Sequence, residues 1–264
     1  MEHEFVEVAN LRGSRERIAV RLDEPASVQS SFAILYLHGF GSRQAGEKAT
    51  FFRARALEEG WPFCSFDFRG HGASEGSMRE LTLSRNLEDV AAVRRHLAGR
   101  GHERLALFGS SMGGATALWH AAREPEGVIG AVHVAPAVGM LQELERWAGA
   151  EGLERWRRDG TIRYTSELVD CELGWAMVED LRGYRNEELA ARYRTPTLLF
   201  QGRLDTTVDW RDVDAFAAAA APGLVDLRVF EDGDHRLVDR KELLWREARR
   251  FLARAEAAAP DARG

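Results

Sequence analysis

The amino-acid sequence predicts an α/β fold, built as a doubly wound, mostly parallel sheet with a small helical cap insertion. The first reason is order: apolar runs typical of buried strands alternate with helical stretches along most of the chain, as in βαβ units. The second is the single interruption of this alternation, at residues 136–193. The third is size, since 264 residues with 45% hydrophobic content suffice for one large α/β domain with an insertion.

Two strands are expected near the start of the chain, at residues 5–8 and 17–22. Their apolar and polar residues alternate, which is typical of half-buried antiparallel strands. Residues 32–37 are continuously apolar and indicate a strand that is buried on both faces. A helix is expected from about Glu47 to Glu59, where apolar residues gather on one side.

The middle of the chain continues the alternation. Residues 62–68 predict a strand, and Leu83 to Leu97 predicts a helix because its apolar residues recur at helical spacing. Residues 104–111 form a strand that runs into a turn, and residues 112–124 form the helix directly after it. Residues 128–135 predict another buried strand.

The alternation resumes beyond the insertion. Residues 195–202 and 225–230 predict strands, separated by a helix near residues 209–220. A last helix is expected from Lys241 to Arg254, with a frayed tail after it. Right-handed crossovers place the helices on both faces of the sheet.

The insertion, residues 136–193, is predicted to be a cap on a core made of residues 1–135 and 194–264. A structureless loop of this length is improbable, so we expect two or three helices and a short hairpin around residues 161–166. Its large apolar residues are expected to roof a cavity beyond the ends of the strands, with the alternative that they only pack the cap onto the core. The predicted substrate-binding residues are Trp147, Trp156, Trp175 and Met177, with Leu141, Leu144 and Leu168 beside them.

Composition excludes several classes of function. The net charge is −6 without a basic stripe, so nucleic acid is not an expected partner. No run approaches the length of a membrane span, and the acidic N-terminus is not typical of a signal peptide, so we expect a cytoplasmic protein. Cys64 and Cys171 are far apart, without metal-type spacing, and are interpreted as free thiols in a reducing compartment.

Ser111 is the candidate nucleophile. It lies in the pentapeptide Gly-Ser-Ser-Met-Gly, between a predicted strand and a predicted helix, which is the setting that gives a G-x-S-x-G match its mechanical meaning. Only Ser111, and not Ser110, has glycines at both flanking positions, Gly109 and Gly113. A Cβ at either flanking position would crowd the tight turn.

A nucleophilic serine needs a base and a group that orients the base. Two histidines follow Ser111: His133, near the end of a buried strand, and His235, in a loop after the last strand. A base must reach the serine from a loop at the carboxyl edge of the sheet, which favours His235 and leaves His133 a packing role.

The orienting acid is expected in the turn after the strand at residues 195–202. Asp205 is favoured there, whereas Asp209 is placed to cap the following helix. Asp232 and Asp234 flank His235 but are interpreted as turn formers, because adjacent side chains in a loop diverge. The oxyanion is expected to bind the backbone amides of Met112 and Phe40.

These motifs resemble those of the α/β-hydrolases. The resemblance covers the chain from about Phe32 onward and is carried by LHGFGS, DFRGHGASEG, GSSMGG, QGRLDTTV and GDHRL. It implies the α/β-hydrolase fold, and it implies a structural turn for Asp67, Arg69 and His71. Within the superfamily the chain is most similar to small-cap serine esterases and acyl-thioesterases.

The expected activity is hydrolysis of carboxylic esters with short-to-medium acyl chains through an acyl-enzyme intermediate. A small-molecule ester is the expected partner, no metal or organic cofactor is needed, and a homodimer is left open. The first alternative is a thioesterase, or an amide or peptide hydrolase of the proline-aminopeptidase type. In the latter, acidic cap residues would hold a free amine, although a charged helix face explains the same residues, which are Glu143, Glu145, Glu151, Glu154, Glu167 and Glu172. The second alternative is a hydrolase-fold binding protein or receptor with little turnover.

Overall fold

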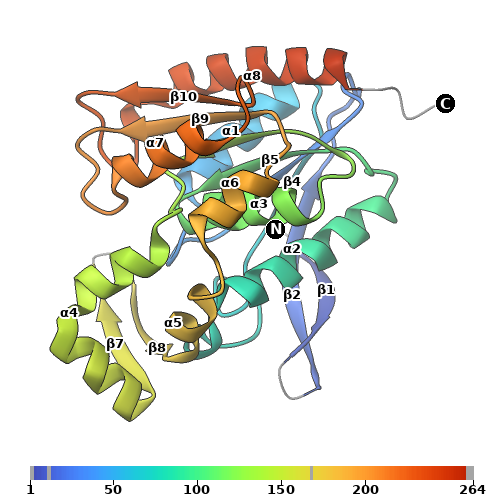
Figure 1. The fold of residues 1–264 in the computed structure, drawn as a ribbon. Helices are drawn as coiled ribbons and strands as arrows, with labels where there is room; N and C mark the ends of the chain where they lie inside the picture. Colours follow the sequence, from blue (N-terminus) through green and yellow to red (C-terminus); the bar gives the residue numbers. More distant parts are fainter. Residues whose placement is uncertain (1–2, 11–12, 167–168, 260–264) are drawn as a thin grey trace.

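A mixed sheet of eight strands forms the centre of the computed structural model, which describes residues 3–10, 13–166 and 169–259 (Figure 1). The six strands from β4 to β10 in the sheet run parallel, and β2 pairs antiparallel with both β1 and β4. The predicted α/β fold with a mostly parallel sheet is therefore confirmed. In spatial order the strands are β1 (Glu4–Ala9), β2 (Arg15–Asp23), β4 (Phe63–Phe66), β3 (Ala33–Leu37), β5 (Leu105–Ser110), β6 (Val128–Val134), β9 (Thr197–Gly202) and β10 (Val225–Phe230).

Helices cover both faces of this sheet (Figure 1). One face carries α1 (Glu47–Glu58) and α8 (Lys241–Ala258), and the other carries α2 (Leu83–Ala98), α3 (Met112–Arg123), α6 (Asn186–Arg192) and α7 (Trp210–Ala219). Because both faces are covered, every residue of β3, β4, β5 and β9 is buried. This burial explains why these strands are continuous apolar runs in the sequence.

The region at residues 136–193 holds α4 (Met140–Asp159), the antiparallel hairpin of β7 (Thr161–Thr165) and β8 (Asp170–Gly174), α5 (Ala176–Leu181) and α6. The hairpin predicted around residues 161–166 is thus present. Figure 1 shows α4, the hairpin and α5 as a group beside the sheet, whereas α6 packs on α3 and α7. Helix α4 is interrupted at Gly149, whose φ of 65° lies outside the helical region.

The C-terminal helix differs from the prediction. It continues to Ala258, so the expectation of a frayed tail from Arg254 onward was wrong for the described residues. The reason is tertiary packing: Ala255 is buried, and a Cβ built on Gly130 of β6 would lie 3.3 Å from the Cβ of Ala255. Contact with the sheet therefore stabilises a last turn whose sequence resembles a solvated tail.

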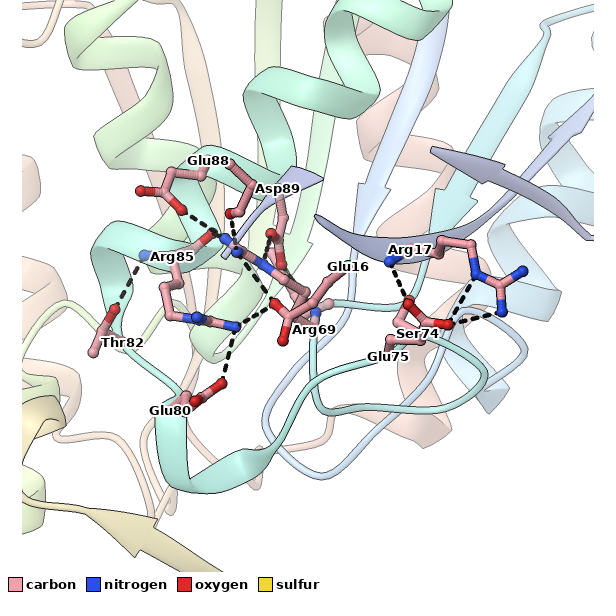
Figure 2. A network of polar contacts seen from close by, with 12 residues as sticks. Glu16, Arg17, Arg69, Ser74, Glu75, Glu80, Thr82, Arg85, Glu88 and Asp89 are labelled. Carbon is pink, nitrogen blue, oxygen red and sulfur yellow. Dashed lines mark hydrogen bonds and ion pairs between the residues drawn. The ribbon is translucent and has the colours of Figure 1, made fainter. Parts of the chain in front are cut away.

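The turn after β4 is fixed by a buried charge. The Arg69 guanidinium donates hydrogen bonds to the carboxylate of Asp89 and, at 2.7 Å, to that of Glu88 (Figure 2). The backbone N–H of Arg69 also donates to Asp89, at 2.9 Å. Asp67 accepts from the backbone N–H groups of Gln44 (2.6 Å) and Ala73 (2.9 Å). These contacts agree with a structural role for this turn.

We expect Asp89→Ala to lower the free energy of unfolding by about 3 kcal/mol, because it leaves a buried guanidinium without its main partner. Arg69 and Asp89 are 2% and 0% exposed in their side chains. The matched control is Arg17→Ala, which breaks an ion pair with Glu75 that is exposed on both sides (Figure 2). The control should hardly change stability. Urea unfolding measures both, and equal losses would contradict the buried role.

Candidate active site

Ser111 lies in a strained turn between β5 and α3. Its φ of 52° and ψ of −121° are rarely adopted by a residue with a side chain. The predicted need for the flanking glycines is confirmed. A Cβ on Gly113 would lie 2.2 Å from the Leu37 carbonyl oxygen, and one on Gly109 would lie 2.6 Å from the Cα of Gly114. The turn holds Ser111 at the wall of a cavity.

Ser110 makes a local contact instead. Its Oγ accepts a hydrogen bond of 2.8 Å from Nζ of Lys48, and the residue is buried. Burial, followed by the nearby charge of Arg236, lowers the pKa of Lys48 to about 8. Lys48 was not predicted to lie beside the turn, and nothing in its sequence context indicates that it does.

Asp205 and His235 are paired, as the sequence predicts. Nδ1 of His235 and Oδ2 of Asp205 are 2.7 Å apart. The pair forms because β9 ends directly under the loop of His235: a Cβ on Gly202 would lie 2.3 Å from the Gly233 carbonyl oxygen. With Nδ1 bound to the carboxylate, Nε2 of His235 is the nitrogen left to accept a proton.

The Asp205 carboxylate is held on several sides. Its Oδ1 accepts the backbone N–H groups of Thr207 (2.8 Å) and Val208 (2.9 Å), and its Oδ2 accepts from the Gln201 side chain (3.0 Å). Burial disfavours the charged form, but the contact with His235 and the backbone hydrogen bonds outweigh it and lower the pKa of Asp205. The acid therefore stays ionised and keeps the imidazole in one orientation.

The other histidines and acids take structural positions. His133 is completely buried in β6, neither ring nitrogen has a partner among the described residues, and burial lowers its pKa to about 3. Asp209 caps α7, accepting from the backbone N–H of Arg211 at 3.0 Å. Asp234 accepts two backbone N–H groups within its own turn, and Asp232 pairs with Arg240. These placements match the expectations for His133, Asp209 and Asp234.

The predicted oxyanion donors lie on either side of Ser111. Met112 begins α3, and Phe40 follows β3 in a loop that approaches the serine, since a Cβ on Gly39 would lie 3.3 Å from the Ser111 Cβ. Both residues line the cavity. Within the described ranges, neither backbone N–H donates to another group of the chain. Two amides are thus available next to one hydroxyl, which suits an oxyanion.

The cavity that contains Ser111 has a volume of about 970 Å³. One part of its wall is mostly apolar and comes from the loop after β3, the start of α3, α4, the hairpin and α5. Another part is more polar and charged, and comes from the loop after β9 and the start of α7. The lining residues include Phe40, Met112, Ala137, Met140, Leu144, Trp147, Tyr164, Leu173 and Met177 in the first part, and Arg203, Asp205, Thr206, Thr207, Asp209, Trp210 and Arg211 in the second, with Glu143 and Arg146 of α4 adding charge.

The predicted cap residues divide into two groups. Trp147, Met177 and Leu144 line the cavity, whereas Trp156 and Trp175 do not, which corrects the prediction for these two. Trp156 is completely buried, because its indole N–H donates to the Leu173 carbonyl (3.0 Å) and its ring packs on Trp175. Both hold the cap together.

The two remaining predicted cap residues are Leu141 and Leu168. Leu141 lies at a second, much smaller cavity, and Leu168 is outside the described residues. Tyr164, Arg203 and Trp210 also line the cavity, although the sequence did not predict them. Arg203 and Trp210 could have been found by their position just beyond the carboxyl end of β9, where cavities of such sheets form.

Glu143 brings a perturbed carboxyl group to the cavity. Its Oε1 is buried and has no hydrogen-bond partner among the described residues. Burial raises the pKa of Glu143 to about 8. The negative charges of Asp212, Asp205 and Asp209 act in the same direction, and Arg146 opposes them.

No cluster of three or more His, Cys, Asp or Glu side chains suited to a metal ion occurs in the described ranges, and no described helix could cross a membrane. Cys64 and Cys171 are free thiols, as predicted.

Comparison with known proteins identifies a matching family and several relatives. Residues 29–160 match the family described as serine aminopeptidase, S33. Among curated proteins, palmitoyl-protein thioesterase ABHD10 of Bos taurus is 24% identical over 80% of this chain and 69% of its own length, and the Homo sapiens protein is 25% identical over the same shares.

Solved structures extend the likeness to the whole fold. A structure from Agrobacterium vitis aligns with a TM-score of 0.82 and 28% identity, covering 96% of this chain and 100% of that one. Est1E from Butyrivibrio proteoclasticus, solved with ferulic acid bound, aligns with a TM-score of 0.78 and 20% identity, covering 96% and 100%.

Proposed function

The chain belongs to the serine aminopeptidase S33 family of the α/β-hydrolase superfamily, and we propose that this serine hydrolase cleaves carboxylic esters with short-to-medium acyl chains. The observation that carries the proposal is the hydrogen bond between Asp205 and His235, together with a strained Ser111 that lines the same cavity as Asp205. Esterases and thioesterases among the related proteins, at low identity, support the same class of chemistry.

In the proposed mechanism, Nε2 of His235 takes the proton of Ser111 as Oγ attacks the acyl carbon. The backbone amides of Met112 and Phe40 bind the oxyanion, and each such donor typically lowers the barrier by about 3–4 kcal/mol. His235 then donates the proton to the departing alcohol, which leaves the acyl group on Ser111. A water molecule, deprotonated by His235, attacks the acyl carbon, and the acid leaves as Ser111 regains its proton.

The preference for short-to-medium chains follows from the distribution of the cavity wall. The volume of about 970 Å³ would by itself admit large substrates, since ligand pockets commonly measure about 300–1,000 Å³. Each buried methylene gains about 0.8 kcal/mol only where it meets apolar atoms. The wall also carries charged side chains, among them Arg211 and Asp209. Chain extension should therefore stop being favourable where it meets charged rather than apolar atoms.

A panel of p-nitrophenyl esters tests this proposal. We expect the highest kcat/KM with acyl chains of about two to eight carbons, because methylenes beyond the apolar wall gain little. Trp147→Ala should move the optimum to longer chains while acetate esters are still hydrolysed. Trp175→Ala is the matched control, since Trp175 does not line the cavity, and it should leave the optimum in place. An optimum at palmitoyl esters in the wild-type protein, or a preference that neither variant moves, would contradict the proposal.

The thioesterase alternative uses the same residues, and the name of ABHD10 as a palmitoyl-protein thioesterase favours testing it. Acyl-CoA substrates of matched chain length should be cleaved more slowly than the esters if the ester proposal is right. Stoichiometric labelling of Ser111 without turnover of any substrate would instead favour the binding-protein alternative.

Amide hydrolysis is the second candidate, and Glu143 is the specific observation in its favour. A buried carboxyl group without a partner could receive the ammonium group of an aminoacyl substrate. Glu143 is largely protonated at neutral pH in the empty cavity, because its pKa is raised to about 8. Hydrolysis of aminoacyl-p-nitroanilides that is lost in Glu143→Gln, with ester hydrolysis kept, would favour this candidate.

A further inference from the structure

We propose that Tyr164, in the hairpin of the cap, is a positioning residue that holds the oxyanion loop, residues 38–41, in its active geometry. The inference rests on the proposed function, because it assigns the loop to oxyanion binding. It gives the cap a part in the chemical step besides its part in substrate choice.

The core side of the oxyanion loop is rigid. The backbone N–H of Phe68 donates to Nε2 of His38 (3.1 Å), so Nδ1 of His38 carries the proton and donates to the Gly39 carbonyl (2.8 Å). The His71 ring packs edge-on against His38, with centroids 5.0 Å apart, and against Phe40, at 6.2 Å. Both histidines are buried. These contacts hold the oxyanion loop from the side of the core.

The cap side is closed by the hairpin. The Tyr164 ring packs edge-on against the Phe40 ring, with centroids 5.2 Å apart and planes at 84°. The next contact along the loop is also from the hairpin, since a Cβ on Gly41 would lie 3.0 Å from a methyl group of Val169. The Phe40 ring is therefore held between His71 of the core and Tyr164 of the cap, and its own backbone N–H is the candidate oxyanion donor.

The hairpin is anchored well enough to transmit this contact. At its base, Gly174 approaches the core so closely that a Cβ there would lie 2.1 Å from the Arg79 carbonyl oxygen. The Trp156 indole ties α4 to the adjacent Leu173. Tyr164 is supported from behind by Trp147, at a centroid distance of 4.9 Å. Aromatic contacts thus run without a break from the cap to the oxyanion loop.

The position of Phe40 matters for catalysis more than for binding. An oxyanion donor acts mainly on charge that develops in the transition state, so its displacement lowers kcat and has little effect on KM. Loss of one donor typically costs about 10²- to 10³-fold in kcat, and a displacement of about 1 Å can cost a large part of that. Without the contact on its cap side, the loop is still held by His38 and His71 on its core side. Part of the oxyanion stabilisation should therefore remain.

The experiment compares Tyr164→Ala, Tyr164→Phe and Tyr184→Ala. Tyr184 is the matched control, because it also joins the insertion to the core, packing on Trp119 at 4.9 Å, but it does not contact the oxyanion loop. We expect Tyr164→Ala to lower kcat about tenfold for acetyl, butyryl and octanoyl esters alike. KM should change little for the acetyl ester and should rise for the octanoyl ester, because the ring also lines the cavity. Tyr164→Phe keeps the ring and should keep the wild-type kcat, as should Tyr184→Ala. If Tyr164→Ala does not fold, Tyr164→Leu provides the same comparison.

Labelling by a fluorophosphonate provides a second measurement that does not depend on the choice of ester. Its rate also depends on the oxyanion donors, and Tyr164→Ala should slow it about tenfold. A loss of kcat that grows with acyl length, an equal loss in Tyr184→Ala, or unchanged labelling would overturn the role of Tyr164. If the wild-type protein is labelled but hydrolyses no ester, the proposed esterase function is wrong, and the labelling rates still decide the role of Tyr164.

Discussion

Ser111→Ala should reduce kcat by about 10⁴- to 10⁶-fold, the usual range when the nucleophile of a triad is removed. The physical reason is that no covalent intermediate can form without Oγ, and the remaining activity comes from the oxyanion amides and substrate binding alone. The substitution keeps a Cβ at the strained φ of 52°, so the backbone conformation and stability should be close to those of the wild type. Steady-state kinetics with the preferred p-nitrophenyl ester measure the effect.

Ser110→Ala is the matched control for the nucleophile. The residue is adjacent in sequence, but its hydroxyl accepts from Lys48 and does not line the cavity. This variant should keep most of the activity. Mass spectrometry of a fluorophosphonate adduct gives an independent assignment, and an adduct on Ser110 in the wild-type protein would show that the wrong serine has been chosen.

The second large effect is expected from Asp205→Asn, with a loss of about 10⁴-fold in kcat. The carboxylate accepts a hydrogen bond from Nδ1 of His235, whereas an amide can present its NH₂ group to that nitrogen. The imidazole then adopts the other tautomer, with its proton on Nε2, and cannot take the proton of Ser111. Protein folding should be largely preserved, because the asparagine oxygen can still accept the N–H groups of Thr207 and Val208.

Asp209→Asn separates this effect from a general disturbance of the loop. Asp209 caps α7 and asparagine is also a good capping residue, so activity and stability should both be nearly unchanged. Asp209→Ala, which removes the cap, should lower the free energy of unfolding by about 1 kcal/mol while kcat stays within the wild-type range. If instead Asp209→Asn abolishes activity and Asp205→Asn does not, the orienting acid is Asp209.

Much of the fold and the candidate triad could be predicted from the sequence, because the determining signals are local. Strands covered on both faces must be apolar throughout, so β3, β5 and β9 are visible as continuous runs. The turn of Ser111 requires glycines at fixed positions, which the sequence displays directly. Asp205 and His235 follow from the chain order of this fold and from their places after successive strands, and their contact is present in the structure. Their catalytic roles stay predictions until the variants are measured.

The cap illustrates what only the tertiary structure decided. Trp147, Trp156 and Trp175 look alike in sequence, yet the first lines the cavity and the other two pack inside the cap. The physical reason is that a cavity wall and a packed core both require apolar side chains, so residue type cannot separate them. Periodicity does not help either, because α4 is broken at Gly149 and its helical spacing does not continue across the break. The contact of Tyr164 with Phe40 and the extension of α8 to Ala258 have the same origin, since each depends on a partner that is distant in the sequence and close only in the folded chain.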